Sequence, residues 1–141
     1  MLLICNFEEL QALSTGADLL MDSGSHGMAG AVAAPPEAFA QVAMLQPRLA
    51  SSLEIDTLDE QRWVRKAVAA ICNELHDRMD EKVIEYHPAH EEAVAYYFDY
   101  AHAFGVLHRL DDMGAEMTAM IELMTGGAPS ADAARGMNFN G

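Results

Sequence analysis

The sequence predicts an all-α fold: a helical bundle built on a long antiparallel helical hairpin, with shorter N-terminal helices packed across it. Three observations favour this fold. Two segments begin with the side-chain pattern of a helix capping box. Apolar residues recur at spacings of three and four through most of the chain, and no segment alternates apolar and polar residues as a half-buried strand does. We expect a single domain over residues 1–127, followed by a short mobile tail over residues 128–141.

The first helix is predicted from Asn6 to about Asp22. Asn6 is a favourable N-cap residue, and Glu9 follows it at the spacing of a capping box. Gly16 is a poor helix former, but it is small enough to let a neighbouring helix approach closely. One face of this helix carries the apolar residues expected in the core: Phe7, Leu10, Leu13, Ala17, Leu20 and Met21.

The segment over residues 23–36 is rich in glycine and alanine and has no hydrophobic period. We expect a flexible connection there. A short second helix is predicted to begin at Pro36 and to bend or end at Pro47, because proline interrupts a helix interior. The apolar residues that follow are expected to continue its face in a second short turn: Leu49, Leu53 and Ile55.

Two long helices are predicted to form the hairpin, over residues 58–86 and 88–125. Thr57 and Glu60 form the second capping box, and Pro88 suits the first position of a helix. The first of these helices carries five basic and seven acidic residues, whereas the second carries one basic and seven acidic residues. Antiparallel packing about the short hinge between them therefore reduces charge repulsion.

The apolar face of the second long helix changes sides along its length. In the first half it consists of Ala93, Val94, Tyr97, Tyr100, Ala101, Phe104 and Leu107. In the second half it consists of Leu110, Met113, Met117, Met120, Ile121 and Met124. A straight helix cannot bury both faces against one surface. We therefore expect either a break near Gly105, Asp111–Asp112 or Gly114, or an unbroken helix of about 57 Å that contacts two different partners.

Charge and composition exclude several classes of function. The net charge of −14 repels phosphates and anionic lipids, so neither nucleic acid nor a membrane surface is an expected partner. The sequence has no apolar run long enough to span a membrane. Its first residues lack a basic region and have only a short apolar run, so we expect no signal peptide. Cys5 and Cys72 have no metal-binding spacing, so we interpret both as buried thiols in a cytoplasmic protein. No cofactor is expected.

One group of side chains has the residue types of a metal site. His87, His90 and Glu91 lie close together in the sequence, and Asp99 follows two turns later. Such groups bind transition metals when they converge on one point. Here the Glu-x-x-His motif of di-metal bundles is missing, and the histidines point in different directions around the helix. A metal- or small-ligand-binding bundle, possibly an enzyme, is therefore the alternative function.

A stripe of four methionines favours a different function. Met113, Met117, Met120 and Met124 recur at helical spacing, which is typical either of a bundle core or of an adaptable surface for a partner helix. The leading hypothesis is a non-enzymatic protein that acts by self-association or by binding a partner helix. Because the long helix overhangs its domain, we expect a homodimer.

Overall fold

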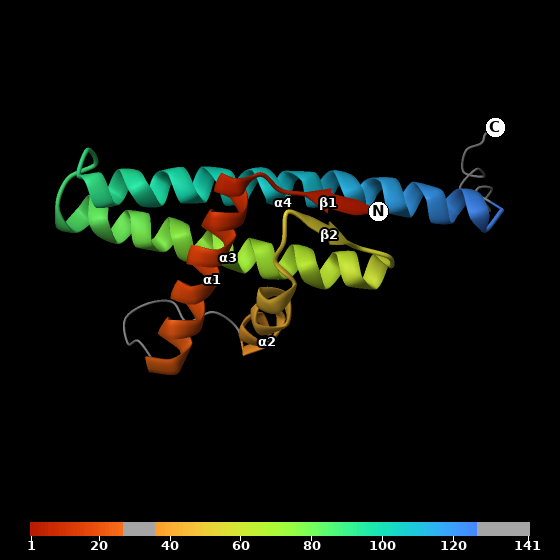
Figure 1. Ribbon diagram of the computed structural model, residues 1–141, viewed down its shortest axis with the longest axis horizontal. Helices are drawn as coiled ribbons and strands as arrows, with labels where there is room; N and C mark the ends of the chain where they lie inside the picture. The colour runs from red at the N-terminus through yellow and green to blue at the C-terminus, as the bar shows by residue number, and fades with distance from the viewer. Residues whose placement is uncertain (27–35, 127–141) are drawn as a thin grey trace, which may run out of the picture.

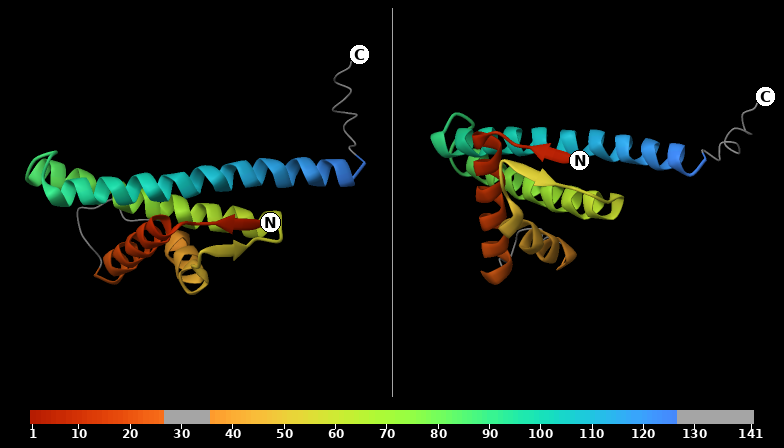
Figure 2. Two further views of the ribbon diagram at one scale, coloured as in Figure 1. Left: turned by 45° about the horizontal axis from the view of Figure 1, so that its top comes forward. Right: turned by 45° about the vertical axis from the view of Figure 1, so that its right-hand side comes forward.

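The computed structural model describes residues 1–26 and 36–126 (Figure 1). In these residues the elements follow the order β1 (Leu2–Ile4), α1 (Phe7–His26), α2 (Pro36–Leu45), the 3-10 helix η1 (Gln46–Arg48), β2 (Ser52–Glu54), α3 (Leu58–Glu85) and α4 (Glu91–Met124). The predicted all-α architecture is confirmed. The helices α3 and α4 form a long antiparallel hairpin, and Figure 2 shows α1 and α2 on one side of it.

The hairpin begins at the predicted capping box. The backbone N–H of Glu60 donates to Oγ1 of Thr57 at 3.0 Å, which fixes the start of α3. The second helix differs from the prediction, because it begins at Glu91 rather than at Pro88. His90 is its N-cap residue, and Nδ1 of His90 accepts the N–H of Glu92 at 3.2 Å.

Neither of the two candidate glycines breaks α4. The helix runs through Gly105 and Gly114 for 34 residues, a length of about 51 Å. The unbroken alternative is therefore the one that the structure adopts. Two ion pairs join α4 to α3 across the hairpin: Arg65 with Asp111 at 2.6 Å, and Lys82 with Glu92 at 3.2 Å. These pairs join basic residues of α3 to acidic residues of α4, as the larger number of basic residues on the first predicted helix of the hairpin indicated.

Helix α1 crosses the hairpin and contacts both of its helices. Its capping box is confirmed in both directions, since the N–H of Glu9 donates to Asn6 Oδ1 at 2.8 Å and the N–H of Asn6 donates to Glu9 Oε1 at 2.9 Å. At the crossing, Gly16 faces Ile71 with no room for a side chain. The helix continues to His26, four residues into the predicted flexible segment, and residues 27–35 lie outside the described part of the chain.

The sheet was not predicted. Its strands β1 and β2 pair antiparallel, with Leu3 opposite Leu53, and they lie over the hairpin (Figure 1). We expected Leu53 and Ile55 to continue the apolar face of α2 in a second helical turn, but Leu53 lies in β2 and Ile55 directly follows it. They alternate with exposed Ser52 and Glu54, so that both apolar side chains enter the core.

All these elements share one hydrophobic core. Helix α4 contributes an inner stripe to it from its middle onward: Ala103, Val106, Leu110, Met113 and Met117. The two apolar faces predicted for α4 do lie on opposite sides of it: the second-half face is buried as far as Met117, whereas Val94, Tyr97 and Phe104 of the first-half face are exposed. Every helix within residues 1–26 and 36–126 is too short or too polar to serve as a membrane span. The predicted tail over residues 128–141 lies outside the described residues.

Candidate functional site

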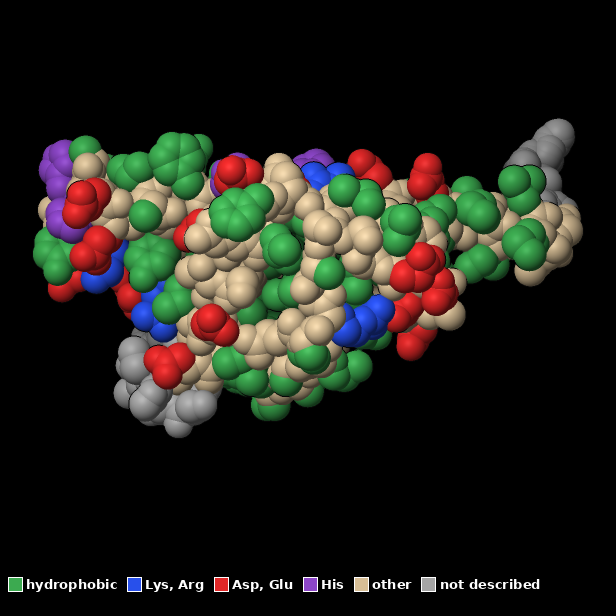
Figure 3. Space-filling model, in the orientation of Figure 1, with side chains coloured by type: hydrophobic (Ala, Val, Ile, Leu, Met, Phe, Trp, Pro, Cys, Tyr) green, Lys and Arg blue, Asp and Glu red, His purple; other side chains and the backbone are tan. Residues whose placement is uncertain are grey.

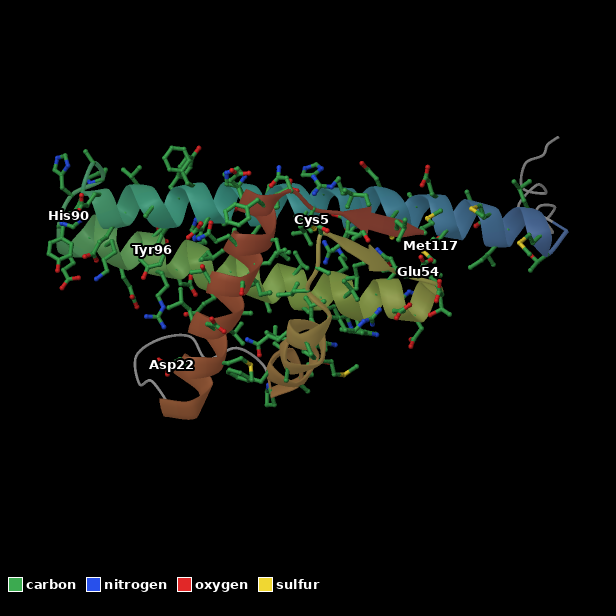
Figure 4. All side chains as sticks on the ribbon, viewed as in Figure 1. Cys5, Asp22, Glu54, His90, Tyr96 and Met117 are labelled. Atoms are coloured by element: carbon green, nitrogen blue, oxygen red, sulfur yellow. The ribbon has the colours of Figure 1, made fainter. Side chains whose placement is uncertain are left out.

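The histidine cluster lies at the closed end of the hairpin, where Figure 4 labels His90. Nδ1 of His87 accepts the N–H of Ala89 at 3.0 Å, and the His90 ring stacks on the Tyr86 ring with centroids 4.3 Å apart. Together with the N-cap bond of His90, these contacts make the two histidines part of the turn between α3 and α4.

The proposed metal ligands do not converge. Glu91 is exposed in the first turn of α4, and Asp99 is half-buried two turns further along. Burial raises the pKa of Asp99, and the positive charge of His102 only partly opposes this. No three His, Cys, Asp or Glu side chains in the described parts of the chain form a group that could hold a metal ion. The geometry therefore does not favour the metal-binding alternative.

The methionine stripe is divided by the structure. Met113 and Met117 are 7% and 8% exposed and belong to the core, whereas Met120 and Met124 are 52% and 82% exposed. The division occurs because α4 extends past the start of α3 (Figure 1). We call residues 118–124 the overhang. Its exposed large side chains are Met120, Ile121, Leu123 and Met124.

A second exposed apolar surface lies on the outer side of α4, opposite the inner stripe. Val94, Tyr97, Ala101 and Phe104 are all exposed there, and we call these four residues the outer stripe. Figure 3 shows hydrophobic side chains along this half of α4. Tyr96, by contrast, packs against the core on the side toward α3 (Figure 4). These four residues belong to the apolar face predicted for the first half of the helix, and this part of that face is exposed.

The spacing of the outer stripe is that of a helix-pairing seam. Its residues follow one another at intervals of three, four and three positions, the heptad pattern that keeps side chains facing a second helix. Phe98, which is 57% exposed, extends the surface on one side. Aromatic residues are enriched in protein interfaces because each supplies a large contact area with few rotatable bonds.

The outer stripe is also poor in charge. Only one of the 22 acidic residues of the chain, Asp99, lies between Ala93 and Leu110. The one basic residue in that segment, Arg109, is neutralised by a bidentate contact, in which its Nη1 and Nη2 donate to Glu9 at 2.9 and 2.6 Å. An apolar, uncharged surface thus interrupts an otherwise strongly acidic protein.

Glu9 is the most deeply placed carboxylate near this surface, at 8% exposure. Burial opposes its ionisation, but the hydrogen bonds from Arg109 and Asn6 and the charges of Arg109 and His102 outweigh burial and lower the pKa of Glu9. Arg109 also donates to the carbonyl of Ile4 at 3.1 Å. The ion pair therefore fixes α1 and β1 to the middle of α4.

The cysteines have the environment that the sequence predicts. Both Cys5 and Cys72 are buried free thiols. Burial raises the pKa of Cys72 to about 12, so its reactive thiolate is scarce at neutral pH. Neither residue is arranged as a catalytic nucleophile.

Comparisons of the chain with known protein families, with curated proteins and with solved structures found no match.

Proposed function

We propose that this protein is a non-enzymatic self-association module that forms a homodimer through the outer stripe of α4. The observation that supports this proposal is the heptad of exposed apolar residues, Val94, Tyr97, Ala101 and Phe104, on the outer side of a rigid helix. Contiguous exposed apolar patches on soluble proteins often mark interaction sites.

The outer stripe is complementary to itself. In an antiparallel pair of α4 helices, with the two-fold axis at the level of residue 99, Tyr97 faces Ala101 of the second copy and Phe104 faces Val94 of the second copy. Each large side chain then meets a small one, as interdigitated packing requires. A two-fold axis also satisfies the rule that the same patch serves both subunits of a symmetric dimer.

A second copy is the occupant that the charge distribution favours. Two chains of net charge −14 repel each other, and the repulsion is smallest where the facing surfaces carry no carboxylates. The outer stripe is such a surface. Added salt screens the remaining repulsion and is therefore expected to strengthen the dimer.

The exposed area of the outer stripe is that of a small interface, below the roughly 1,200–2,000 Å² of a stable complex, so it fits a weak, reversible dimer. Tyr97 is 54% exposed, Phe104 41% and Val94 36%, which corresponds to about 250 Å² of buried surface per copy when a full aromatic side chain buries 150–250 Å². At about 25 cal/mol per Å², two copies gain about 12 kcal/mol. Association costs roughly 4–15 kcal/mol in lost freedom, so we expect exchange between monomer and dimer rather than a permanent complex.

Sedimentation equilibrium of Phe104→Ala tests the proposal. This change removes roughly 160 Å² of apolar contact over two copies, or about 4 kcal/mol, so the dimer Kd should rise by a hundredfold or more. Ile84→Ala, at an 84% exposed residue of α3 outside the stripe, is the matched control and should leave Kd within about twofold. A wild-type protein that stays monomeric at high concentration and moderate salt would refute the proposal.

The overhang supports a second candidate function, which is binding of an amphipathic partner helix. Leu123 and Met124 are 80% and 82% exposed at the end of α4, and methionine-rich helical surfaces adapt to different partners. Met124→Glu distinguishes the two candidates. If the outer stripe joins the two copies and the overhang serves a partner helix, this variant should leave the dimer Kd within about twofold. Dissociation of the dimer by Met124→Glu but not by Phe104→Ala would instead mean that the overhang joins the copies and is not free for a partner helix.

A further inference from the structure

Within the described residues, the outer edge of β1 has no partner strand. On β1 the odd-numbered residues bond to the segment around β2: the N–H of Cys5 donates to the carbonyl of Ser51 at 2.9 Å, and the N–H of Ile55 donates to the carbonyl of Met1 at 2.8 Å. In an antiparallel pair, alternate residues direct their backbone groups away from the partner strand. Leu2 and Ile4 therefore present their N–H groups at the opposite edge of β1.

A groove runs along this edge. It has a volume of about 690 Å³, and it lies between β1 and the part of α4 that carries Arg109, Asp112, Met113 and Glu116. Leu2 and Ile4 are 55% and 58% exposed, so the strand offers apolar side chains together with its unpaired N–H groups. Exposed edges with these features accept an added strand.

The groove is acidic. Asp112 and Glu116 are exposed, one turn apart on α4, and neither forms an ion pair within the described residues. The charge of Arg109 is already neutralised by Glu9, and its Nη2 occupies the carbonyl of Ile4 at the end of the edge. The N-terminal ammonium of Met1, which also lines the groove, pairs with Glu54 at 3.3 Å. Two carboxylates without a counter-charge thus border the path of an added strand.

We infer that the open edge of β1 binds a basic segment in extended conformation, which adds to the sheet as a third strand. The N–H groups of Leu2 and Ile4 bond to its backbone. Its apolar side chains contact Leu2 and Ile4, and its Lys or Arg side chains meet Asp112 and Glu116. A second copy of this chain is a poor occupant, because pairing two β1 edges would bring four carboxylates together on two chains of net charge −14 each. The inference does not depend on the outer stripe.

The test uses a fluorescein-labelled octapeptide of alternating valine and lysine, titrated with the full chain and followed by fluorescence anisotropy. We expect saturable binding that weakens with added salt. The same peptide with glutamate in place of lysine should not bind. A lysine peptide with a central proline, which lacks one N–H of the strand ladder, should bind at least fivefold more weakly.

Two double variants test the position of the site. Asp112→Asn with Glu116→Gln should weaken binding of the valine–lysine peptide at least fivefold. Glu81→Gln with Glu122→Gln removes the same charge from exposed positions outside the groove and should change binding less than twofold. Equal effects of the two pairs would overturn the inference, because they would mean that the peptide responds only to net charge.

Amide hydrogen exchange measured by NMR tests the strand addition itself. On peptide binding, the amides of Leu2 and Ile4 should gain at least tenfold protection, whereas the amide of Cys5, which already donates to Ser51, should change little. Binding of the lysine peptide without protection of Leu2 and Ile4 would overturn the inference. Binding of the glutamate peptide with equal affinity would do the same.

Discussion

Gly16 is predicted to stabilise the crossing of α1 and α3, although it lies in the middle of a helix. A Cβ atom added there would lie 2.5 Å from Cγ2 of Ile71 and 3.1 Å from Cδ1 of Leu75. Carbon atoms in contact prefer separations of about 3.5–4.0 Å. Because Ile71 and Leu75 are fully buried, they have no space into which to move, and α1 must shift outward by about 1 Å.

Two opposing effects determine the stability of Gly16→Ala. Replacing glycine by alanine in a helix interior gains about 1 kcal/mol of helix propensity. Overpacking a well-filled core costs about 1–3 kcal/mol, and a displaced helix backbone belongs at the upper end of that range. We therefore expect the free energy of unfolding to fall by about 1–2 kcal/mol. Urea unfolding, followed by circular dichroism at one fixed protein concentration, should show a lower midpoint with an unchanged slope.

Two further variants distinguish the packing effect of Gly16→Ala from its effect on helix propensity: Ser14→Ala as a control, and Ile71→Ala in a double-mutant cycle with Gly16→Ala. Ser14→Ala changes an exposed residue one half-turn away and should stabilise the protein by a few tenths of a kcal/mol. Ile71→Ala removes the methyl group that opposes the new side chain, so its cost in the Gly16→Ala background should be at least about 1 kcal/mol smaller than in the wild type. A more stable Gly16→Ala protein, or additive effects of the two changes, would refute this account of the helix crossing.

Two further predictions concern α4 and its contacts. The lowered pKa of Glu9 means that its pairing with Arg109 contributes stability above the unfolded pKa of about 4.3, which is lost as pH falls through the lower folded value. The stability of Glu9→Gln should therefore depend less on pH between about 5 and 3 than that of the wild type, as measured by urea midpoints. Met117→Lys places a charge in the core and should cost about 2–5 kcal/mol. Met124→Lys, in the overhang, should change thermal stability by less than about 0.5 kcal/mol.

The helix boundaries were predictable where local bonds determine them. Both capping boxes join residues three positions apart, so the sequence contains the whole interaction. Pro88 shows the limit of this approach. Proline is suitable for the first position of a helix, but the helix begins after it, because His90 caps the backbone and stacks on Tyr86 from the preceding segment.

The sheet was not predictable in this way. Each strand has only three residues, and Leu3 pairs with Leu53 fifty positions later. So short a segment shows no clear alternation, and the pairing depends on how α1 and α2 bring the chain back. The position of Leu53 therefore became apparent only in the folded structure.

The sequence could not show which of the two apolar faces of α4 is buried, and the reason is physical. Apolar residues surround the first half of this helix, so its periodicity alone cannot identify the buried side. In the structure, small or slender residues such as Ala103 and Val106 pack inward, whereas Tyr97 and Phe104 lie outside. Tyr96 and Tyr100 still pack partly against the core, and the Tyr100 ring contacts His76 of α3 with centroids 5.2 Å apart, so ring size alone does not determine which side is buried. The aromatic residues of the outer stripe are thus available for other contacts. Hydrophobicity alone would assign these residues to the core.

The charge along α4 explains why two different partners are expected for one helix. From Ala93 to Leu110 it has one acidic residue, whereas from Asp111 to Glu122 it has four. The first part can approach an identical acidic chain with little added repulsion, while the second repels such a chain and attracts a basic one. Screening by salt weakens repulsion and attraction alike. Added salt should therefore strengthen self-association through the outer stripe and weaken binding of a basic strand beside β1, so a single salt series separates the two surfaces.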